Sequence, residues 1–455
     1  MAVGGKGVVS GAGSLGPSLP TGVGRCSIWR MSGPSGANAR ATSVVIVGGG
    51  VIGVCAAYFL ARRGAAVTVL ERGDLCRGAS FGNAGGITPG HVPINKPGRV
   101  AQALRSLNRP TNPLYLAPRW DPALALWLFS FARNCTQEHL EACMAVFGPL
   151  GKASMVLFDR LVEGESLACA YRRDGYAEVY RTAAGLAAGR ADAALERRYG
   201  FQSTELSGAE AREYEPALSD AIVGAVRYPE GATLDPYRFV IELAERAVRH
   251  GARVRTGADV ARVLLRGGKL AGVELRGGEV VAADAVVLAA GAYTSRLTRP
   301  LGLRLPLQPA KGYHRDYDPN DGATPRLRTA CILGESSIFC ADLGGFVRLA
   351  GTLEFSGLNE GLRRSRLEQL TLGARQSFRG MGDPTPISEW CGLRPCLPDG
   401  LPAIGPAPGI PGLIVATGHA MMGLTLGPVT GQLVAEWLLE GAPGTEFTAL
   451  RVGRF

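Results

Sequence analysis

The sequence lacks the patterns that mark several common classes of protein. Its ten cysteines are scattered singly, with no CxxC pair, which argues against a zinc site and a disulfide framework and suggests a reducing compartment. No run approaches the roughly 18 uninterrupted apolar residues of a membrane-spanning helix. The formal net charge is +10, but no block of like charges occurs. We therefore expect a solvated basic surface and no nucleic-acid partner.

Acidic residues are also absent from residues 1–42, which are rich in Gly, Ser and Pro. A segment of this composition has too little apolar surface to order itself. Targeting peptides are basic and poor in acids too, but this segment has no clear amphipathic period and no continuous apolar core. We expect a disordered tail, with a targeting peptide as the alternative and Met31 as a candidate start.

Residues 44–72 predict a strand, a glycine turn, a helix and a second strand. Gly48, Gly50 and Gly53 fit the pattern G-x-G-x-x-G. In this pattern glycine permits the tight turn, the approach of a pyrophosphate and the close packing of helix on strand. Glu71 closes the second strand, where a carboxylate accepts hydrogen bonds from ribose hydroxyls. The arrangement predicts a dinucleotide-binding βαβ unit.

Three further segments favour FAD over NAD. Residues 72–90 form a glycine-rich loop that can lie along an extended cofactor. Residues 235–295 predict a helix, strands joined by two Gly-Gly hairpin turns, and a buried parallel strand, so the dinucleotide part resumes after a long insertion. Residues 387–440 predict a last strand and a helix that begins near Pro428, with its positive end toward the cofactor.

The chain resembles the D-amino acid oxidase-type FAD oxidoreductases, and among them the bacterial D-amino acid dehydrogenase small-subunit type. The resemblance covers roughly residues 43–440. It rests on the segments VVIVGGGVIGVCAAYFLARRGAAVTVLER, GASFGNAGGITPG, VVLAAGAYT, QPAKGYH, CGLRPCLPDGLPAIG and GHAMMGLTLGPVTG. The last of these looks closer to the glycine oxidase pattern and also suits hydroxyproline-type relatives. Substrate and electron acceptor therefore stay open.

The expected fold combines α/β and α+β parts: an FAD-binding Rossmann-type (glutathione reductase 2-like) domain and a mainly antiparallel-sheet substrate domain built from insertions. We place the cofactor domain at residues 43–100, 231–302 and 386–445, and the substrate domain at 101–230 and 303–385. The apolar stretch 120–135 is interpreted as a helix buried against the sheet. A membrane-interface helix that passes electrons to quinone is the alternative.

The cofactor is expected to be a noncovalent FAD, because no cysteine, Cys391 and Cys396 included, stands out as a covalent link. The resemblance and the motifs together give these predicted FAD contacts: Gly48, Gly50, Val51, Ile52, Gly53, Glu71, Arg72, Ser80, Asn83, Ala84, Gly85, Ile87, Val260, Ala290, Gly291, Gly423, Leu424 and Thr425.

Three residues are predicted to serve the reaction itself. The resemblance implies that Arg394, in the GLRP segment, anchors a substrate carboxylate, which a guanidinium can match with two parallel hydrogen bonds. The alternative is a structural ion pair with Asp399 or Glu389. Tyr313 and His419 are possible secondary contacts, and His419 is equally well interpreted as a packed histidine. Lys311 is a further candidate, to hold a water or oxygen near the flavin.

The resemblance implies oxidative deamination of a small amino acid, most simply a D-amino acid, by an FAD-dependent dehydrogenase. Hydride leaves Cα for flavin N5, and the resulting imine hydrolyses to a 2-oxo acid. One alternative is an oxidase of glycine, sarcosine, proline or hydroxyproline that uses oxygen. Another is a noncatalytic FAD-binding assembly factor. The expected partners are the amino acid and a quinone or oxygen; the expected location is cytoplasmic, with at most peripheral contact to the inner membrane.

Overall fold

The dinucleotide part is built around a parallel sheet, seen in a computed structural model that describes residues 42–101, 112–444 and 447–455. Among these residues the sheet has six strands in the order β19-β20-β13-β1-β2-β9, of which only β19 runs antiparallel. The strands are β1 (Ser43–Val47), β2 (Ala66–Leu70), β9 (Arg253–Arg255), β13 (Ala285–Leu288), β19 (Ala403–Pro406) and β20 (Leu413–Thr417). We call it the parallel sheet. The expected tail, residues 1–42, lies outside the described residues apart from Thr42.

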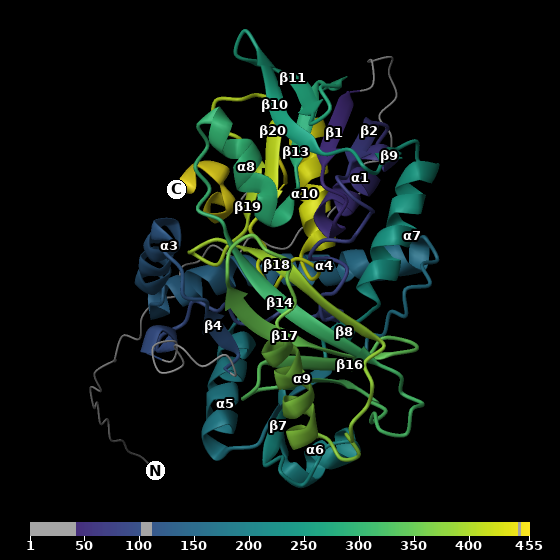
Figure 1. Cartoon of the computed structure of the whole chain (residues 1–455), viewed down its shortest axis with the longest axis vertical. Helices are drawn as coiled ribbons and strands as arrows, with labels where there is room; N and C mark the ends of the chain where they lie inside the picture. The colour runs from purple at the N-terminus through teal and green to yellow at the C-terminus, as the bar shows by residue number, and fades with distance from the viewer. Residues whose placement is uncertain (1–41, 102–111, 445–446) are drawn as a thin grey trace, which may run out of the picture. The chain divides into compact units, whose positions relative to one another are not determined.

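Helices cover one face of the parallel sheet and a small antiparallel sheet covers the other (Figure 1). The helices α1 (Val51–Arg62), α7 (Pro236–Arg249) and α10 (Gly427–Leu439) pack side by side. The small sheet consists of β10 (Val260–Arg266), β11 (Lys269–Leu275) and β12 (Val280–Ala282). Its two turns fall at the Gly-Gly pairs, as the sequence predicts.

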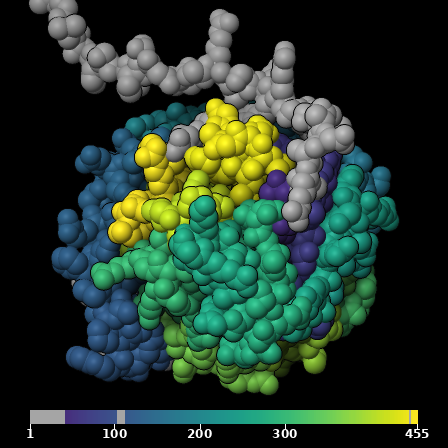
Figure 2. All heavy atoms as spheres, turned by 90° about the horizontal axis from the view of Figure 1, so that it is seen from above, coloured from purple at the N-terminus to yellow at the C-terminus, as the bar shows by residue number. Residues whose placement is uncertain are grey.

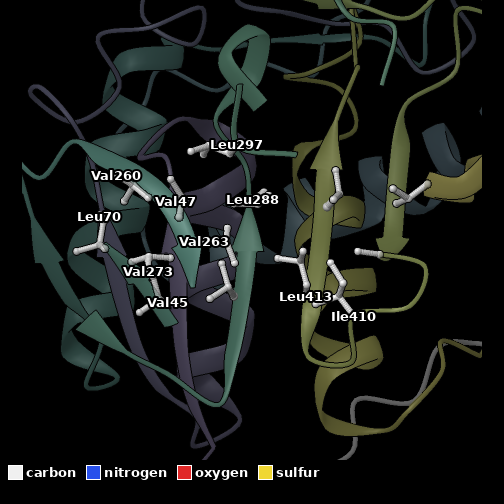
Figure 3. Close-up of a cluster of buried hydrophobic side chains, with 14 of the residues drawn as sticks. Val45, Val47, Leu70, Val260, Val263, Val273, Leu288, Leu297, Ile410 and Leu413 are labelled. Carbon is white, nitrogen blue, oxygen red and sulfur yellow. The ribbon is translucent and has the colours of Figure 1, made fainter. Parts of the chain in front are cut away.

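The buried core of this part lies between the parallel sheet and the small sheet (Figure 3). Val45 and Val47 of β1, Leu288 of β13 and Leu413 of β20 meet Val263 of β10 there, and all five are less than a tenth exposed. Three segments far apart in sequence therefore share one core, and they adjoin on the surface at this end of the molecule (Figure 2). Apolar burial of this kind is the main driving force for folding.

The second part is built on a large mixed sheet, which has nine strands among the described residues. Its order is β18-β14-β17-β16-β15-β5-β7-β6, with β4 beside β17. The strands are β4 (Leu114–Leu116), β5 (Tyr176–Tyr180), β6 (Thr204–Ser207), β7 (Gly224–Tyr228), β14 (Gln308–Tyr317), β15 (Ala330–Leu333), β16 (Ile338–Asp342), β17 (Val347–Phe355) and β18 (Ser388–Cys396). Most pairs are antiparallel, but β5–β15 and β4–β17 are parallel. We call it the large sheet.

The large sheet differs from the sequence prediction at one boundary. The sequence predicts that residues 386–445 belong to the cofactor part, but β18 is the edge strand of the large sheet, paired with β14 from Asp316 to Gln308. The segment carrying Arg394 therefore belongs to the substrate side. The chain returns to the parallel sheet only at β19. The fold class itself, an FAD-type Rossmann part with an insertion-built sheet, is confirmed.

Four helices flank the large sheet among the described residues: α3 (Pro122–Arg133), α5 (Ala183–Arg198), α6 (Gly208–Tyr214) and α9 (Arg364–Ser377). The long helix α4 (Gln137–Gly164) packs against α10. The shorter elements are β3 (Gly86–Ile87), β8 (Ala232–Thr233), α8 (Thr294–Thr298), η1 (Gly291–Tyr293), η2 (Arg299–Leu301), η3 (Thr448–Leu450) and η4 (Val452–Arg454). By length and composition alone α4 could cross a membrane, but 61% of its most apolar window is buried in the protein, as in a core helix.

Candidate active site

A cavity of about 1720 Å³ connects the two parts of the described structure. At one end it is bordered by the loops that follow β1, β2 and β13, at the carboxyl ends of the parallel strands. In open α/β sheets this edge is where nucleotides bind. At the other end it is bordered by one face of the large sheet and by α3 and α5.

Each of the three motif glycines in the turn after β1 is required for a different structural reason. Gly48 has φ +112°, and a Cβ there would lie 2.5 Å from the carbonyl oxygen of Ala289. A Cβ on Gly53 would lie 1.9 Å from the carbonyl oxygen of Gly48, so only glycine lets α1 pack this closely. At Gly50 a Cβ would meet only the Ser80 side chain within 4 Å and would otherwise point into open space. The turn thus leaves a passage over the N-terminus of α1.

The acid at the end of β2 is tied to this turn. Glu71 accepts hydrogen bonds from the backbone N–H of Gly49 at 2.7 Å and of Gly73 at 3.1 Å. It also borders the cavity, beside Arg72. Arg72 lies over the ring of Tyr293, 3.9 Å from its centroid, and pairs with Glu360 at 3.3 Å. Both predicted residues therefore stand at the nucleotide end of the cavity.

The loop 72–90 is fastened to the start of α1 by its small polar side chains. The backbone N–H of Val51 donates to Oγ of Ser80 at 2.9 Å. Asn83 donates to the carbonyl of Ser80 at 2.8 Å and accepts from the N–H of Gly85 at 2.9 Å. These bonds hold the loop along the cavity wall, where a chain segment covering an extended cofactor would lie.

Most of the predicted cofactor residues border this cavity: Gly48, Gly50, Val51, Ile52, Glu71, Arg72, Ser80, Asn83, Ala84, Val260, Ala290, Gly291, Gly423 and Leu424. The other predicted contacts lie behind its wall. Gly53 packs on Gly48, and a Cβ on Gly85 would lie 2.5 Å from the carbonyl oxygen of Leu234. Ile87 is fully buried in the β3–β8 pair, and Thr425 accepts from the N–H of Thr88 at 3.1 Å. These four residues support the wall rather than reach into the cavity.

Arg394 reaches across β14 from the edge strand β18. Its Nη1 donates to the carbonyl of Thr352 on β17 at 2.9 Å. A Cβ on Gly312 would lie 2.2 Å from Nη1, so the guanidinium rests on the one position of β14 that leaves room for it. Burial lowers the pKa of Arg394, yet an arginine stays protonated in a protein.

The structural ion pairs considered for Arg394 do not form. Asp399 pairs with Arg454 at 2.7 Å, and Glu389 pairs with Arg315 and Arg364 at 2.8 and 2.9 Å. Among the described residues no carboxylate lies within 4 Å of the Arg394 guanidinium. Even a partly buried cation without a carboxylate costs free energy. Arg394 is therefore placed to accept an anion from a ligand in the cavity.

Tyr313 and Lys311 lie on the opposite face of β14 from Arg394, because neighbouring residues of a strand point to opposite faces. The hydroxyl of Tyr313 donates to Glu354 at 2.9 Å, and its ring packs in the cluster that includes Leu367 of α9. Lys311 donates to Asn359 and to the carbonyl of Gly361. Tyr313, predicted as a secondary contact, borders the cavity without offering its hydroxyl. Lys311, predicted to hold a water or oxygen, is a buried cation whose ammonium group is bonded within the protein.

His419 is a packed neutral histidine at the cavity wall. It is 3% exposed, and its Nε2 shares a hydrogen bond of 3.0 Å with Oγ1 of Thr430 in α10. Burial lowers its pKa to about 3. Its backbone pairs with Cys396, which brings the loop before α10 against the end of β18. The packed interpretation expects a backbone carbonyl as partner of the His419 ring, whereas the partner is the Thr430 hydroxyl.

Several cavity residues were missed by sequence reasoning. Thr352 has φ +64°, a strained left-handed conformation, and it supplies the carbonyl that holds Arg394. Trp390 stacks on His314 with ring centroids 5.3 Å apart. Trp127 and Phe131 of α3 border the cavity while Leu126 is 71% exposed. Helix α3, expected from the apolar stretch 120–135, is therefore buried on one face only. The helical spacing of its apolar residues was the sequence signal that could have identified the buried face.

Buried neutral histidines predict acid sensitivity. Burial, with Arg348 nearby, lowers the pKa of His314 to about 4, and burial lowers that of His419 to about 3. In the unfolded chain both protonate near pH 6.5, so each contributes stability above that pH and loses it as the pH falls toward the folded-state pKa. We expect a loss of about 2 kcal/mol for each histidine at pH 5.

Urea unfolding of wild type and His419→Gln between pH 8 and pH 5 measures this loss. The unfolding free energy of His419→Gln should depend less steeply on pH than that of wild type. The control is His250→Gln, the same change at a partly exposed position, which should keep the wild-type dependence. Equal slopes for wild type and His419→Gln would contradict a buried, uncharged His419.

A nucleotide cleft of Rossmann type that opens onto a sheet carrying a partly buried arginine fits the class of flavin-dependent oxidoreductases. Residues 43–437 match the family model DAO, described as FAD dependent oxidoreductase. This chain belongs to that family, and its cofactor is FAD.

The chain is similar over nearly its whole length to curated bacterial enzymes. It is 35% identical over 421 residues to D-amino acid dehydrogenase of Methylobacterium radiotolerans, covering 90% of this chain and 99% of that one. It is 33% identical over 418 residues to the D-amino acid dehydrogenase of Bradyrhizobium diazoefficiens, covering 90% and 98%. Among solved structures, glycine oxidase from Geobacillus kaustophilus matches with a TM-score of 0.72 at 24% identity, covering 91% and 100%. The last likeness concerns the fold alone.

The residues present fit FAD. The passage over Gly50, the open helix N-terminus of α1 without acidic side chains in its first turn, and Glu71 suit a pyrophosphate and a ribose. Gly423 and Leu424, just before α10, border the cavity on the side of β18. There a helix N-terminus stabilises negative charge on a bound ring system.

Proposed function

We propose that this protein is a dehydrogenase that oxidises the Cα–N bond of a D-amino acid, giving an imine that water hydrolyses to a 2-oxo acid. FAD, when bound, supplies the acceptor for the hydride that leaves Cα. The protein residues position the substrate. The observation that carries the proposal is Arg394, which lies partly buried over Gly312, has no carboxylate partner among the described residues and faces a cavity that continues to the nucleotide cleft.

Arg394 would hold the substrate carboxylate by two parallel hydrogen bonds and so fix the direction of Cα. His419, Trp390 and Phe131 form part of the surrounding wall and exclude water. Tyr313 is not placed to act as a base at this wall, because its hydroxyl donates to Glu354. His419 is a poor base there, because burial lowers its pKa to about 3. The substrate amine is therefore proposed to lose its proton before oxidation.

The proposed substrate class and acceptor follow the relatives named D-amino acid dehydrogenase. We propose a quinone or a protein carrier as acceptor, with oxygen as the alternative, and a location in the cytoplasm or against the inner membrane. An oxidase of glycine or proline type is the second candidate, because the fold is also that of a glycine oxidase. A noncatalytic flavin-binding factor is disfavoured because Arg394 has no carboxylate partner in the part of the chain that the structure describes.

Anaerobic mixing of the FAD-loaded protein with D-alanine, L-alanine, glycine, D-proline and L-proline tests the proposal. We expect loss of the yellow flavin colour with the D-amino acids, slow return of the colour in air and fast return with a quinone. Fast return in air would favour the oxidase. No bleaching by any amino acid would contradict the enzymatic function.

A further inference from the structure

The cavity continues beyond the Arg394 site along the large sheet. Successive strands place Ala350 beside Phe339, Phe339 beside Ile332, and Ile332 beside Glu178. All four of these residues border the cavity. Because neighbouring strands lie about 4.8 Å apart, Glu178 on β5 is about 14 Å from β17, which holds the guanidinium of Arg394. We call the region between β5, α5 and residues 91–99 the acidic arm.

One face of α5 forms the opposite wall of the acidic arm. Ala184, Ala188, Asp192 and Glu196 recur every fourth residue, on one side of the helix, and all border the cavity. Gly189 lets the helix approach β5, since a Cβ there would lie 2.1 Å from the hydroxyl oxygen of Tyr180. The arm is thus a built recess between a helix and a sheet.

The cations at the arm are already engaged. Lys96 forms an ion pair with Asp192, and Arg99 lies near the same carboxylate and donates to the carbonyl of Ile94. Glu335, at the same recess, accepts from the backbone N–H groups of Arg181 and Thr182. These charges are satisfied within the protein.

Two carboxyl groups in the arm form no ion pair within 4 Å among the described residues, and Lys96 acts on both from farther away. The one hydrogen bond that Glu178 accepts in this part of the chain comes from the Tyr180 hydroxyl, at 2.7 Å. Glu196 is 3% exposed and borders the cavity. Among the described residues no donor hydrogen-bonds its carboxyl group and no cation lies within 4 Å of it. Burying an unpaired carboxylate is costly, so such a group is neutral until a cation arrives. Consistently, burial raises the pKa of Glu196 well above its usual range, ahead of repulsion by Glu178.

We infer that the acidic arm binds the cationic end of a substrate side chain, so that the preferred substrates are basic amino acids with long unbranched side chains, of the lysine, ornithine or arginine kind. This inference rests on the proposed function. Arg394 takes the carboxylate, and the side chain extends past Ala350 and Phe339 to Glu178 and Glu196. The apolar row between the two ends suits a methylene chain, and the two carboxylates suit an ammonium or guanidinium group.

The test compares D-lysine with D-norleucine, which lacks only the terminal ammonium group. We expect wild type to favour D-lysine in kcat/KM. In Glu196→Gln, the ratio of the two kcat/KM values should fall roughly 10- to 100-fold, mainly through KM for D-lysine, because a charge-assisted hydrogen bond is lost. Glu178→Gln should shift the ratio in the same direction. Glu205→Gln, the same change at an exposed position on β6, should keep the wild-type ratio.

Glutamine resembles a protonated carboxyl group in shape, so both glutamine variants should fold. Measurements of flavin content and of thermal unfolding check that they do. Oxidation of D-norleucine with no preference for D-lysine, or an unchanged ratio in both glutamine variants, would overturn the inference while leaving the proposed function standing. Absence of oxidation with every amino acid would instead overturn the proposed function.

Discussion

Arg394→Ala should lower kcat/KM for the amino acid substrate by roughly 30- to 4000-fold, corresponding to about 2 to 5 kcal/mol. The guanidinium belongs to a partly buried side chain. Among the described residues its one hydrogen bond is to the carbonyl of Thr352, and no carboxylate lies within 4 Å of it. Its removal would leave the substrate carboxylate desolvated without a partner. Arg394→Lys should recover only part of the loss, since an ammonium cannot form the two parallel bonds.

The same loss should appear when the guanidinium is displaced rather than removed. A Cβ on Gly312 would lie 2.4 Å from Cζ of Arg394, so Gly312→Ala should raise KM while FAD remains bound. Arg364→Ala is the control. The Arg364 side chain is 73% exposed and pairs with Glu389, which lies on β18 like Arg394. Wild-type kinetics in Arg394→Ala, measured at full flavin occupancy, would remove this residue from the site.

Gly53→Ala should destabilise the protein by about 3 kcal/mol or more, a large effect for one methyl group. The added Cβ would lie 1.9 Å from the carbonyl oxygen of Gly48. Because this oxygen belongs to the backbone, it cannot rotate out of the way as a side-chain atom can. Helix α1 would have to move from β1 and from α10, against which it packs. Urea unfolding of the flavin-free protein measures the loss.

Gly50→Ala separates cofactor binding from stability. Its Cβ would meet only the Ser80 side chain, whose Oγ lies 3.0 Å away, and would otherwise stand in the passage for the pyrophosphate. We expect near-normal stability with at least a tenfold loss of FAD affinity, or about 1.4 kcal/mol. Gly277→Ala, where a Cβ meets nothing within 4 Å, is the control. Full stability in Gly53→Ala would contradict the close packing of the turn.

The nucleotide end of the cavity is predictable from sequence because its determinants are local. Gly48, Gly53 and Glu71 act within one βαβ unit. There the regular repeat of side-chain directions along each strand and along the helix fixes where each residue points. Even the helix at α10 begins one residue before Pro428, as the proline indicates. The fold class can be predicted because locally determined units of this kind follow one another in a recognisable order along the chain.

The substrate end depends on contacts between distant segments, which the sequence alone does not reveal. Tyr313 and Gly312 are adjacent, and only the pairing of β14 with its neighbours decides which of them faces Arg394. Likewise Asp399 and Glu389 stand near Arg394 in sequence, but Arg454 and Arg315 neutralise them from elsewhere in the chain. The acidic arm arises from the packing of α5 on β5, and no short motif marks it.

The central claim is that Arg394 anchors a carboxylate beside bound FAD. Titration of the FAD-loaded protein with benzoate, a carboxylate that cannot be oxidised at a Cα–N bond, followed by the flavin absorption spectrum, tests it without turnover. We predict saturable binding to wild type and a dissociation constant at least roughly 30-fold higher in Arg394→Gln. Equal dissociation constants in the two proteins, or a wild-type protein that takes up no flavin, would contradict the account.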